Sequence, residues 1–257
     1  MSGSIMLWNL DGVYRKQTFY RNKDYDWLDF ESIPNTNLLC EKDTLKLMSH
    51  KLSKRSPGVI HYLGSGNYHY LSYLLQSRIK NPYTLILFDH HTDSLPSLSQ
   101  SLISCGSWVL ESLKHLSMLQ KVFIIGVSEE APHYIPTSIR EKVAIYTEHT
   151  LQQNLSTITQ SIIKQIPTDS IYISIDKDTV DPKDAVTAWD HGTLRLKQMM
   201  YMIKALFQYE DVLGVDVCGE YPVRPTNDYR KKERDAIRKN DRANEYILEC
   251  IQTWISY

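Results

Sequence analysis

Residues 85–93 constrain the fold and chemistry of this chain most, because a short apolar run ends there in a cluster of Asp and His. The run Leu-Ile-Leu-Phe follows Pro82 and predicts a buried strand. Open α/β sheets keep their ligand sites at the carboxyl ends of strands. Asp89, His91 and Asp93 are spaced two apart where the chain leaves this strand, so their side chains can converge on one point. Two carboxylates and an imidazole suit a divalent ion such as Mn²⁺, whereas the alternative is a solvated polar turn.

Composition predicts an ordinary soluble protein. A chain of 257 residues can bury a full core, and we expect one α/β domain spanning residues 1–257. The formal net charge of −1 gives no field that would favour nucleic acid or a membrane as a partner. Four widely spaced cysteines without a CxxC pair indicate a reducing compartment. No apolar run reaches transmembrane length and the first residues lack signal-peptide features, so we expect a cytoplasmic location.

Apolar periodicity alternates between strand and helix along the chain. It predicts strands at 5–10, 59–63, 84–88, 122–127, 143–146, 171–175 and 212–217, and helices at 41–54, 71–79, 102–119, 150–165, 194–209 and 228–257. Residues 13–40 have no clear period and are expected to form a long connection. This alternation favours a mostly parallel sheet covered by helices on both faces.

A second strand end repeats the first pattern. Ser174-Ile175 leads into Asp176-Lys177-Asp178, again with acids two apart. If the two strands are neighbours, their ends bring four carboxylates and an imidazole around one crevice. Crowded carboxylates raise one another's pKa, and two divalent ions with bridging carboxylates would relieve that repulsion. The alternative is chance clustering of acids at two separate strand ends.

These two stretches together resemble the signatures of the ureohydrolase family (arginase, agmatinase and formimidoylglutamase). Residues 89–93 match D-x-H-x-D and residues 174–182 match S-x-D-x-D-x-x-D-P, in the family's order. Residues 64–69 resemble the family's Gly-rich loop that ends in a metal-binding His, here His69, although they depart from its G-G-D-H wording. The alternative for His69 is a helix-start histidine without a ligand role. The resemblance implies a three-layer α/β/α fold with a mostly parallel sheet of about eight strands.

The resemblance also implies a binuclear manganese centre with two Mn²⁺ per chain. Its ligands would be His69, Asp89, Asp93 and Asp176 for one ion, and His91, Asp89, Asp176 and Asp178 for the other. A water shared by two cations loses a proton near neutral pH. The resulting hydroxide would attack a guanidinium carbon and release urea and an amine, with Asp178 passing a proton towards the leaving amine.

Three stretches depart from the family pattern. The family's guanidinium-pairing Glu, in D-x-x-E, has its candidate here one residue late at Glu220, and an exposed loop residue is the alternative. The shuttle His of arginases is replaced by Cys105, for which a small buried cysteine is the commoner case. Trp189, Asp190 and His191 are candidates for holding the substrate tail, with an ordinary exposed loop as the alternative.

The sequence therefore predicts a manganese-dependent hydrolase that cleaves a guanidino group of a small molecule or peptide to urea. Family resemblance also suggests a homo-oligomer. One alternative is a manganese phosphodiesterase of the DHH type, since residues 89–91 spell Asp-His-His, although its upstream acidic loop and a role for the second motif are missing. Others are a zinc deacetylase, which the carboxylate-rich set disfavours, and a degenerate family member that binds without catalysis.

Overall fold

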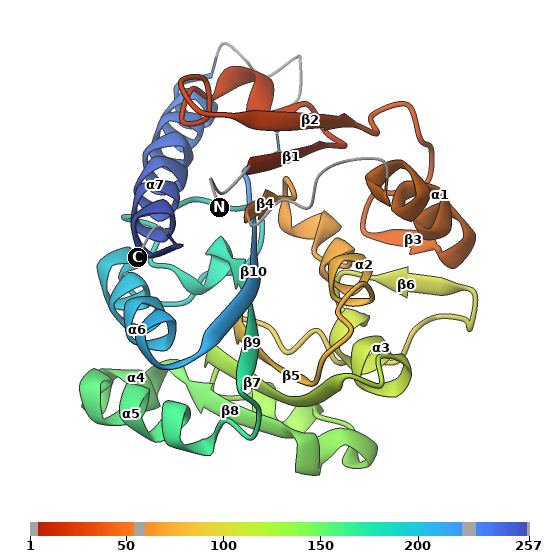
Figure 1. Cartoon of the computed structure of the whole chain (residues 1–257). Coiled ribbons are helices and arrows are strands. Elements are labelled where there is room, and N and C mark those ends of the chain that lie inside the picture. The colour runs from red at the N-terminus through yellow and green to blue at the C-terminus, as the bar shows by residue number, and fades with distance from the viewer. Residues whose placement is uncertain (1–4, 54–59, 223–229, 256–257) are drawn as a thin grey trace.

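The computed structural model describes residues 5–53, 60–222 and 230–255, and its centre is an eight-stranded sheet (Figure 1). All described pairings in this sheet are parallel, in the order β2-β1-β4-β10-β9-β5-β7-β8. The strands are β1 (Ile5–Asn9), β2 (Tyr25–Asp29), β4 (Ile60–Tyr62), β5 (Tyr83–Phe88), β7 (Leu119–Val127), β8 (Val143–Thr147), β9 (Ser170–Asp176) and β10 (Asp211–Cys218). The predicted mostly parallel sheet is confirmed.

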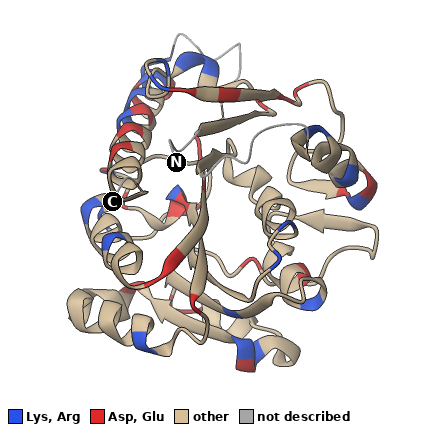
Figure 2. Cartoon of the chain, in the orientation of Figure 1, with Lys and Arg blue, Asp and Glu red and all other residues tan. Residues whose placement is uncertain are grey.

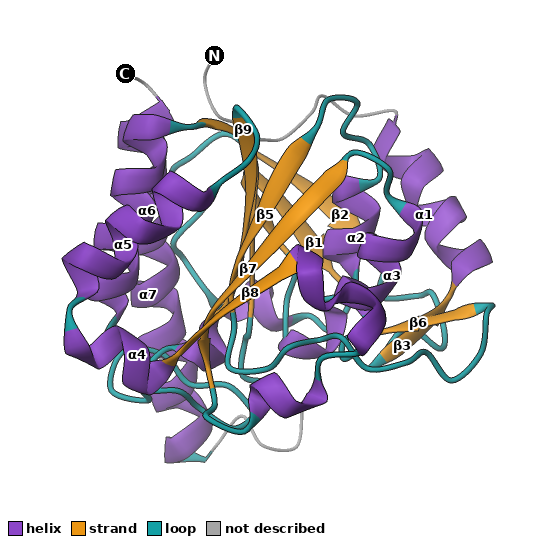
Figure 3. Cartoon of the chain, turned by 90° about the horizontal axis from the view of Figure 1, so that it is seen from below, coloured by secondary structure: helices purple, strands orange, loops and turns teal. Residues whose placement is uncertain are grey.

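Helices cover both faces of the sheet, as Figure 3 shows from below. One layer contains α4 (Glu148–Gln153), α5 (Leu155–Gln165), α6 (Leu196–Tyr209) and α7 (Lys231–Ile255), and the other contains α1 (Lys42–Ser53), α2 (Leu71–Gln76) and α3 (Trp108–His115). Side chains alternate between two cores: Ile86 and Phe88 of β5 join the first, and Leu85 and Leu87 join the second. Because both faces are buried, the strands are continuous apolar runs, and the three-layer α/β/α fold is confirmed.

Two predicted segments differ from the structure. The expected connection at 13–40 contains β2 and the short strand β3 (Leu39–Glu41), which pairs antiparallel with β6 (Leu102–Ser104). Only Leu28 of β2 is fully buried, so this edge strand has little apolar signal. The helix predicted at 102–119 begins only at Trp108, because β6 occupies its first residues and Gly106 separates the two elements.

The C-terminal half follows the predicted elements more closely. The helix predicted at 150–165 is divided at Asn154, whose side-chain oxygen accepts a hydrogen bond from Thr157 N at 3.0 Å and caps α5. Helix α7 carries charges of both signs along its length (Figure 2). The predicted start of that helix at 228–229 and the strand position 59 lie outside the described residues. None of the helices in the described ranges is both long and apolar enough to span a membrane.

The strand order determines where a site forms. β4, β10, β9 and β5 are consecutive in the sheet and parallel, so their carboxyl ends lie side by side at one edge. The segment after β5 begins at Asp89, β9 ends at Asp176, β10 ends at Cys218, and His69 follows β4 after the short helix η2 (Gly66–Tyr68). Residues far apart in sequence therefore meet at one place.

Candidate metal centre

The segment after β5 is folded so that its acidic side chains face one point. Asp89 Oδ1 accepts a hydrogen bond from His91 N at 2.7 Å, which turns the chain sharply after the strand. Asp93 has a left-handed backbone with φ 47°, a conformation that costs energy for a non-glycine residue. Its carboxylate is fixed by Trp108, whose Nε1 donates to Asp93 Oδ2 at 2.6 Å. This local strain and bonding orient Asp93 towards the centre.

The segment after β9 meets the first through hydrogen bonds. Asp176 Oδ1 accepts from Asp178 N at 3.0 Å, and Asp178 Oδ1 accepts from His90 N at 3.0 Å. Both carboxylates are buried. The second motif is therefore tied directly to the backbone of the first.

His69, which follows β4 and η2, adds a buried imidazole to these carboxylates. Its Nε2 lies 2.9 Å from Ser174 Oγ, which donates to Asp216 Oδ1 at 2.6 Å. Since Ser174 uses its proton on Asp216, we assign the proton of the neutral His69 ring to Nε2, so that in this form Nδ1 carries the lone pair. Nδ1 lies 3.2 Å from Asp89 Oδ2, 3.2 Å from Asp93 Oδ2 and 3.5 Å from Asp176 Oδ2.

Two buried atoms at this point lack hydrogen bonds. His69 Nδ1 and Asp89 Oδ2 are both orphaned, which is rare for polar atoms in a protein interior. A lone pair on nitrogen facing carboxylate oxygens is repulsive unless a cation or proton lies between them. The arrangement fits a metal ion, since each atom offers a ligand lone pair to the same space.

A second group overlaps the first. His91 Nδ1 lies 2.8 Å from Asp178 Oδ2 and 3.6 Å from Asp89 Oδ1, so Asp89 belongs to both groups. All six sequence-predicted ligands are therefore brought together: His69, Asp89, His91, Asp93, Asp176 and Asp178. Their proximity fits two ions that share a carboxylate.

The pKa values of the residues in this cluster also reflect repulsion between buried carboxylates. Burial and the neighbouring Asp89 charge raise the pKa of Asp93 to about 6. Burial, with the charges of Asp176 and Asp89, also raises the pKa of Asp178 well above its usual range. Burial alone would lower the pKa of His91, but Asp178 and Asp89 outweigh it and raise that pKa to about 12. Without cations, the cluster has to hold protons instead.

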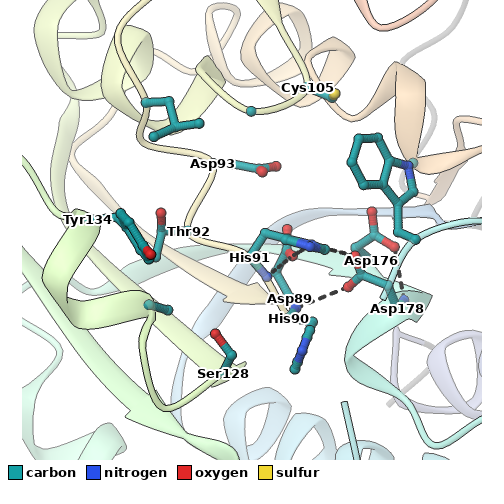
Figure 4. Close-up of a pocket in the computed structure, with 15 residues that line it drawn as sticks. Asp89, His90, His91, Thr92, Asp93, Cys105, Ser128, Tyr134, Asp176 and Asp178 are labelled. Atoms are coloured by element: carbon teal, nitrogen blue, oxygen red, sulfur yellow. Dashed lines mark hydrogen bonds and ion pairs between the residues drawn. The ribbon is translucent and has the colours of Figure 1, made fainter. Parts of the chain in front are cut away.

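A cavity of about 390 Å³ opens above this cluster (Figure 4). Asp89, His91, Asp93, Asp176 and Asp178 form one side of it. The remaining lining is largely apolar or neutral, and includes Leu95, Cys105, Ala131, Tyr134 and Trp189. None of the described residues that line it is Lys or Arg. The space suits a small organic group beside the carboxylates.

Two of the predicted non-metal site residues line the cavity. Burial and the Asp93 charge raise the pKa of Cys105 to about 12, so its thiol stays protonated at neutral pH. Trp189 lies with its ring 5.7 Å from that of His91, and its Nε1 donates to Asn67 Oδ1 at 3.0 Å. His90 also lines the cavity, but its ring points away from the carboxylates around His91 (Figure 4).

The structure does not bring Asp190 and His191 to the cavity lining. Asp190 is exposed on the same loop. His191 holds the loop itself, because its Nδ1 lies 2.9 Å from Val180 O and its Nε2 accepts from Thr187 N at 3.0 Å. A contact of these two side chains with substrate has no support in this geometry.

Glu220 is also absent from the cavity lining and is only 1% exposed. Its carboxylate is ion-paired with the buried Lys177 and accepts from three side-chain amides: Gln17 at 2.7 Å, Asn240 at 3.1 Å and Asn244 at 2.6 Å. The position three residues after Asp216 is Gly219, with φ 85°, where a Cβ would lie 2.4 Å from Asp176 Oδ1. The geometry gives the predicted pairing of Glu220 with a guanidinium no support.

Three residues that shape the site were not predicted in these roles. Trp108 orients Asp93, and Ser174 with Asp216 orients His69. Ser174 is the first residue of the second motif, which is the one sequence signal for this pair. Nothing in the sequence distinguishes Trp108 from an ordinary core tryptophan.

Comparison with known proteins gives one family. The model of the arginase family matches residues 61–237. An uncharacterized protein of Thermotoga maritima is 31% identical over 161 residues, which are 62% of this chain and 57% of that protein. The match thus spans little more than half of that relative's length.

Solved structures share the fold at low sequence identity. A hypothetical agmatinase from Burkholderia thailandensis superposes with a TM-score of 0.68 at 14% identity, covering 99% of this chain and 87% of that one. Formimidoylglutamase from Bacillus subtilis gives 0.68 at 16% identity, covering 98% and 88%. Arginase from Bacillus caldovelox gives 0.64 at 16% identity, covering 96% and 98%.

Proposed function

This chain belongs to the arginase family of ureohydrolases, and from that premise we propose that it hydrolyses a linear C–N bond of a guanidino or related amidine compound with two divalent ions. The family match gives the DHH phosphodiesterase alternative no support. The six predicted ligands offer carboxylate oxygens and imidazole nitrogens, a set that suits Mn²⁺.

One observation carries the proposal. Two buried atoms, His69 Nδ1 and Asp89 Oδ2, have no hydrogen-bond partner and lie 3.2 Å apart, with the carboxylates of Asp93 and Asp176 beside them. Divalent ions held there would lower the pKa of water and polarise the carbon of a C–N bond. The protein side chains would then position and protonate the reactants.

The proposed roles follow from the hydrogen bonds. Asp216, through Ser174, holds the proton on His69 Nε2, so that Nδ1 faces the centre. Trp108 keeps Asp93 in place. Asp178 lies at the cavity with its Oδ2 2.8 Å from His91 Nδ1, where it would carry a proton to the leaving nitrogen. Cys105, as a protonated thiol, would act as a hydrogen-bond donor.

The cavity also restricts the substrate tail. No Lys or Arg among the described lining residues is available to pair with a carboxylate, and the walls include Leu95, Tyr134 and Trp189. Mostly apolar walls with a few placed polar groups are typical of small-molecule sites, and the described walls here offer no cation to a carboxylate tail. We therefore rank guanidino compounds with a neutral or apolar tail, including arginine within a peptide, above free arginine.

The test is a product assay on protein loaded with Mn²⁺. Arginine, agmatine, guanidinobutyrate, simple alkylguanidines and an arginine peptide are incubated, and urea, ammonia and formamide are measured. The proposal is supported if the native protein releases urea from the alkylguanidines or the peptide and Asp89→Asn does not. Formamide or ammonia alone would move the substrate to a formimidoyl compound. Acetate released from an acetyl-lysine peptide, without urea from any guanidine, would replace it with a deacetylase.

A further inference from the structure

A cysteine lies beside the His69 group. Cys218, the last residue of β10, is buried, and its Sγ donates to Asp176 Oδ2 at 3.1 Å. His69, Asp176 and Cys218 each present one ligand atom within 4.8 Å of the others. Atoms bound to one ion lie about 2.0 to 2.3 Å from it, so separations of about 3 to 4 Å between them are expected. Cys218 has the spacing of a ligand.

A buried nitrogen beside the sulfur is a second, independent sign of a bound ion. His69 Nδ1 is completely buried and has no hydrogen-bond partner, and it lies 3.5 Å from the same Asp176 Oδ2 that Cys218 contacts. An orphaned nitrogen and a sulfur therefore flank one carboxylate oxygen. A cation bound by this oxygen would be within reach of both the nitrogen of His69 and the sulfur of Cys218.

The backbone after Cys218 explains why the sulfur has this access. Gly219, with φ 85°, turns the chain beside Asp176, and a Cβ there would lie 2.4 Å from Asp176 Oδ1. Glu220 then turns away to the buried Lys177. Within the described part of this loop, residues 219–222, no carboxylate therefore reaches the centre, and the adjoining Cys218 supplies the donor.

We propose that Cys218 binds, as a thiolate, the ion held by His69 and Asp176, so that this position prefers a softer divalent ion than the His91 position does. The thiol proton leaves to solvent when sulfur coordinates the ion. Thiolate ligands favour ions such as Zn²⁺, Fe²⁺ or Co²⁺ over Mn²⁺. The His91 group, with only oxygen and nitrogen donors, keeps the harder ion. This inference rests on the proposed function, since it assigns a ligand within the same centre.

The test uses Co²⁺ titrated into the metal-free full-length protein, followed by absorption. Thiolate-bound Co²⁺ gives a sulfur-to-cobalt charge-transfer band in the near ultraviolet, whereas its weaker visible bands report bound cobalt of any ligand set. We expect the charge-transfer band in the native protein and in Cys105→Ser and Cys250→Ser. We expect it to vanish in Cys218→Ser and Cys218→Ala, which keep the visible bands.

Competition between Zn²⁺ and Mn²⁺ gives a second readout. Loss of a direct ligand should reduce the preference for Zn²⁺ over Mn²⁺ in Cys218→Ser by at least about tenfold, which is what loss of an outer-shell partner costs. Cobalt binding without a charge-transfer band, or a band that survives in both Cys218 variants, would overturn the thiolate assignment and leave the hydrolase proposal intact. If the charge-transfer band is lost in Cys105→Ser, the sulfur that binds cobalt is that of Cys105 in the cavity wall. Absence of cobalt binding in the native protein would refute both proposals.

Discussion

Asp11, just after β1, shows at the scale of one residue how burial sets a pH dependence. Its Oδ1 accepts from Val13 N at 3.2 Å and its Oδ2 from Ser65 N at 3.3 Å. Burial raises its pKa from 3.8 to about 6, and these two hydrogen bonds only partly offset it. A raised folded-state pKa means that the folded protein binds the proton more tightly than the unfolded chain.

The stability contributed by that proton is present below pH 3.8 and is lost as the pH rises through about 6. In the native protein, this group should lower the free energy of unfolding by up to about 3 kcal/mol as the pH rises from 3.8 to about 6. Asp11→Asn has no titrating proton, so we expect its free energy of unfolding to lack this part of the fall. Urea unfolding of metal-free native protein and variant across this range measures the difference. Parallel pH profiles of the two proteins would contradict the assignment.

Trp108 is a second single residue with a specific expectation. Its indole nitrogen donates to Asp93 Oδ2 at 2.6 Å, and Trp108→Phe removes that bond while keeping most of the buried surface. Loss of such an orienting partner should weaken divalent-ion binding by about tenfold or more. Isothermal titration of Mn²⁺ into the metal-free protein measures it.

A matched control is Trp8→Phe, since Trp8 is equally buried and its Nε1 donates to His61 Nδ1 at 3.2 Å, outside the cavity lining. It should lose stability but not ion affinity. Equal losses of affinity in the two variants would show that Trp108 acts only through packing.

Residue types at strand ends were predictable from the sequence, but their hydrogen-bond partners were not. Asp89, His91 and Asp176 follow from acids and imidazoles placed two apart after apolar runs. Trp108 becomes an orienting residue only because α3 packs its ring 4.8 Å from that of His69. Cys218 gains its place from the pairing of β10 with β9, which no local pattern encodes.

Between elements, the buried pair of Lys177 and Glu220 joins the end of β9 to α7. Glu220 also accepts from Asn240 and Asn244 of α7, and Lys177 Nζ donates to Asn244 Oδ1 at 2.9 Å. Lys177 stands between Asp176 and Asp178 and is fully buried. Holding this side chain inward therefore fixes the turn that presents both carboxylates.

We expect Glu220→Ala to lower the free energy of unfolding by about 3 to 5 kcal/mol, because it leaves the Lys177 charge buried and unpaired. Replacing both partners by Met should recover much of that loss. The exposed pair of Arg238 and Asp235 on α7 is the control, and Asp235→Ala should cost about 1 kcal/mol or less. If Glu220→Ala is as stable as the native protein but has a raised KM, then Glu220 contacts the substrate, and this structural assignment is wrong.

Element prediction succeeded where burial produced a strong apolar pattern. β5, β7 and β9 are buried on both faces and were found from their apolar runs alone. β2 is an edge strand with a largely polar face, and β6 is a three-residue strand whose pairing with β3 is long-range. Neither leaves a periodic signal, because their stability comes from partners distant in sequence.

At the scale of the whole molecule, the centre depends on the order of the strands. Asp89 and Asp176 become neighbours because β5 and β9 pair in parallel, from Thr84 opposite Ile171 to Phe88 opposite Ile175. Sequence reasoning could place both motifs at strand ends, but adjacency of those strands is a property of topology. An ion bound there links parts of the chain that are far apart, and should stabilise the entire fold.

We therefore expect Mn²⁺ to raise the free energy of unfolding by about 2.7 kcal/mol at a free concentration one hundred times its Kd, because the unfolded chain lacks the site. Excess EDTA should reverse the rise, as measured by thermal unfolding. Asp176→Asn should lose this response, yet be at least as stable as native protein without metal, since it removes a repelling charge beside Asp89. Asp181→Asn is the control: the Asp181 carboxylate accepts a hydrogen bond from Lys183 N at 2.8 Å and lies 3.9 Å from Lys183 Nζ, so the variant should keep the response. Equal stabilisation of the native and Asp176→Asn proteins would place the ion elsewhere.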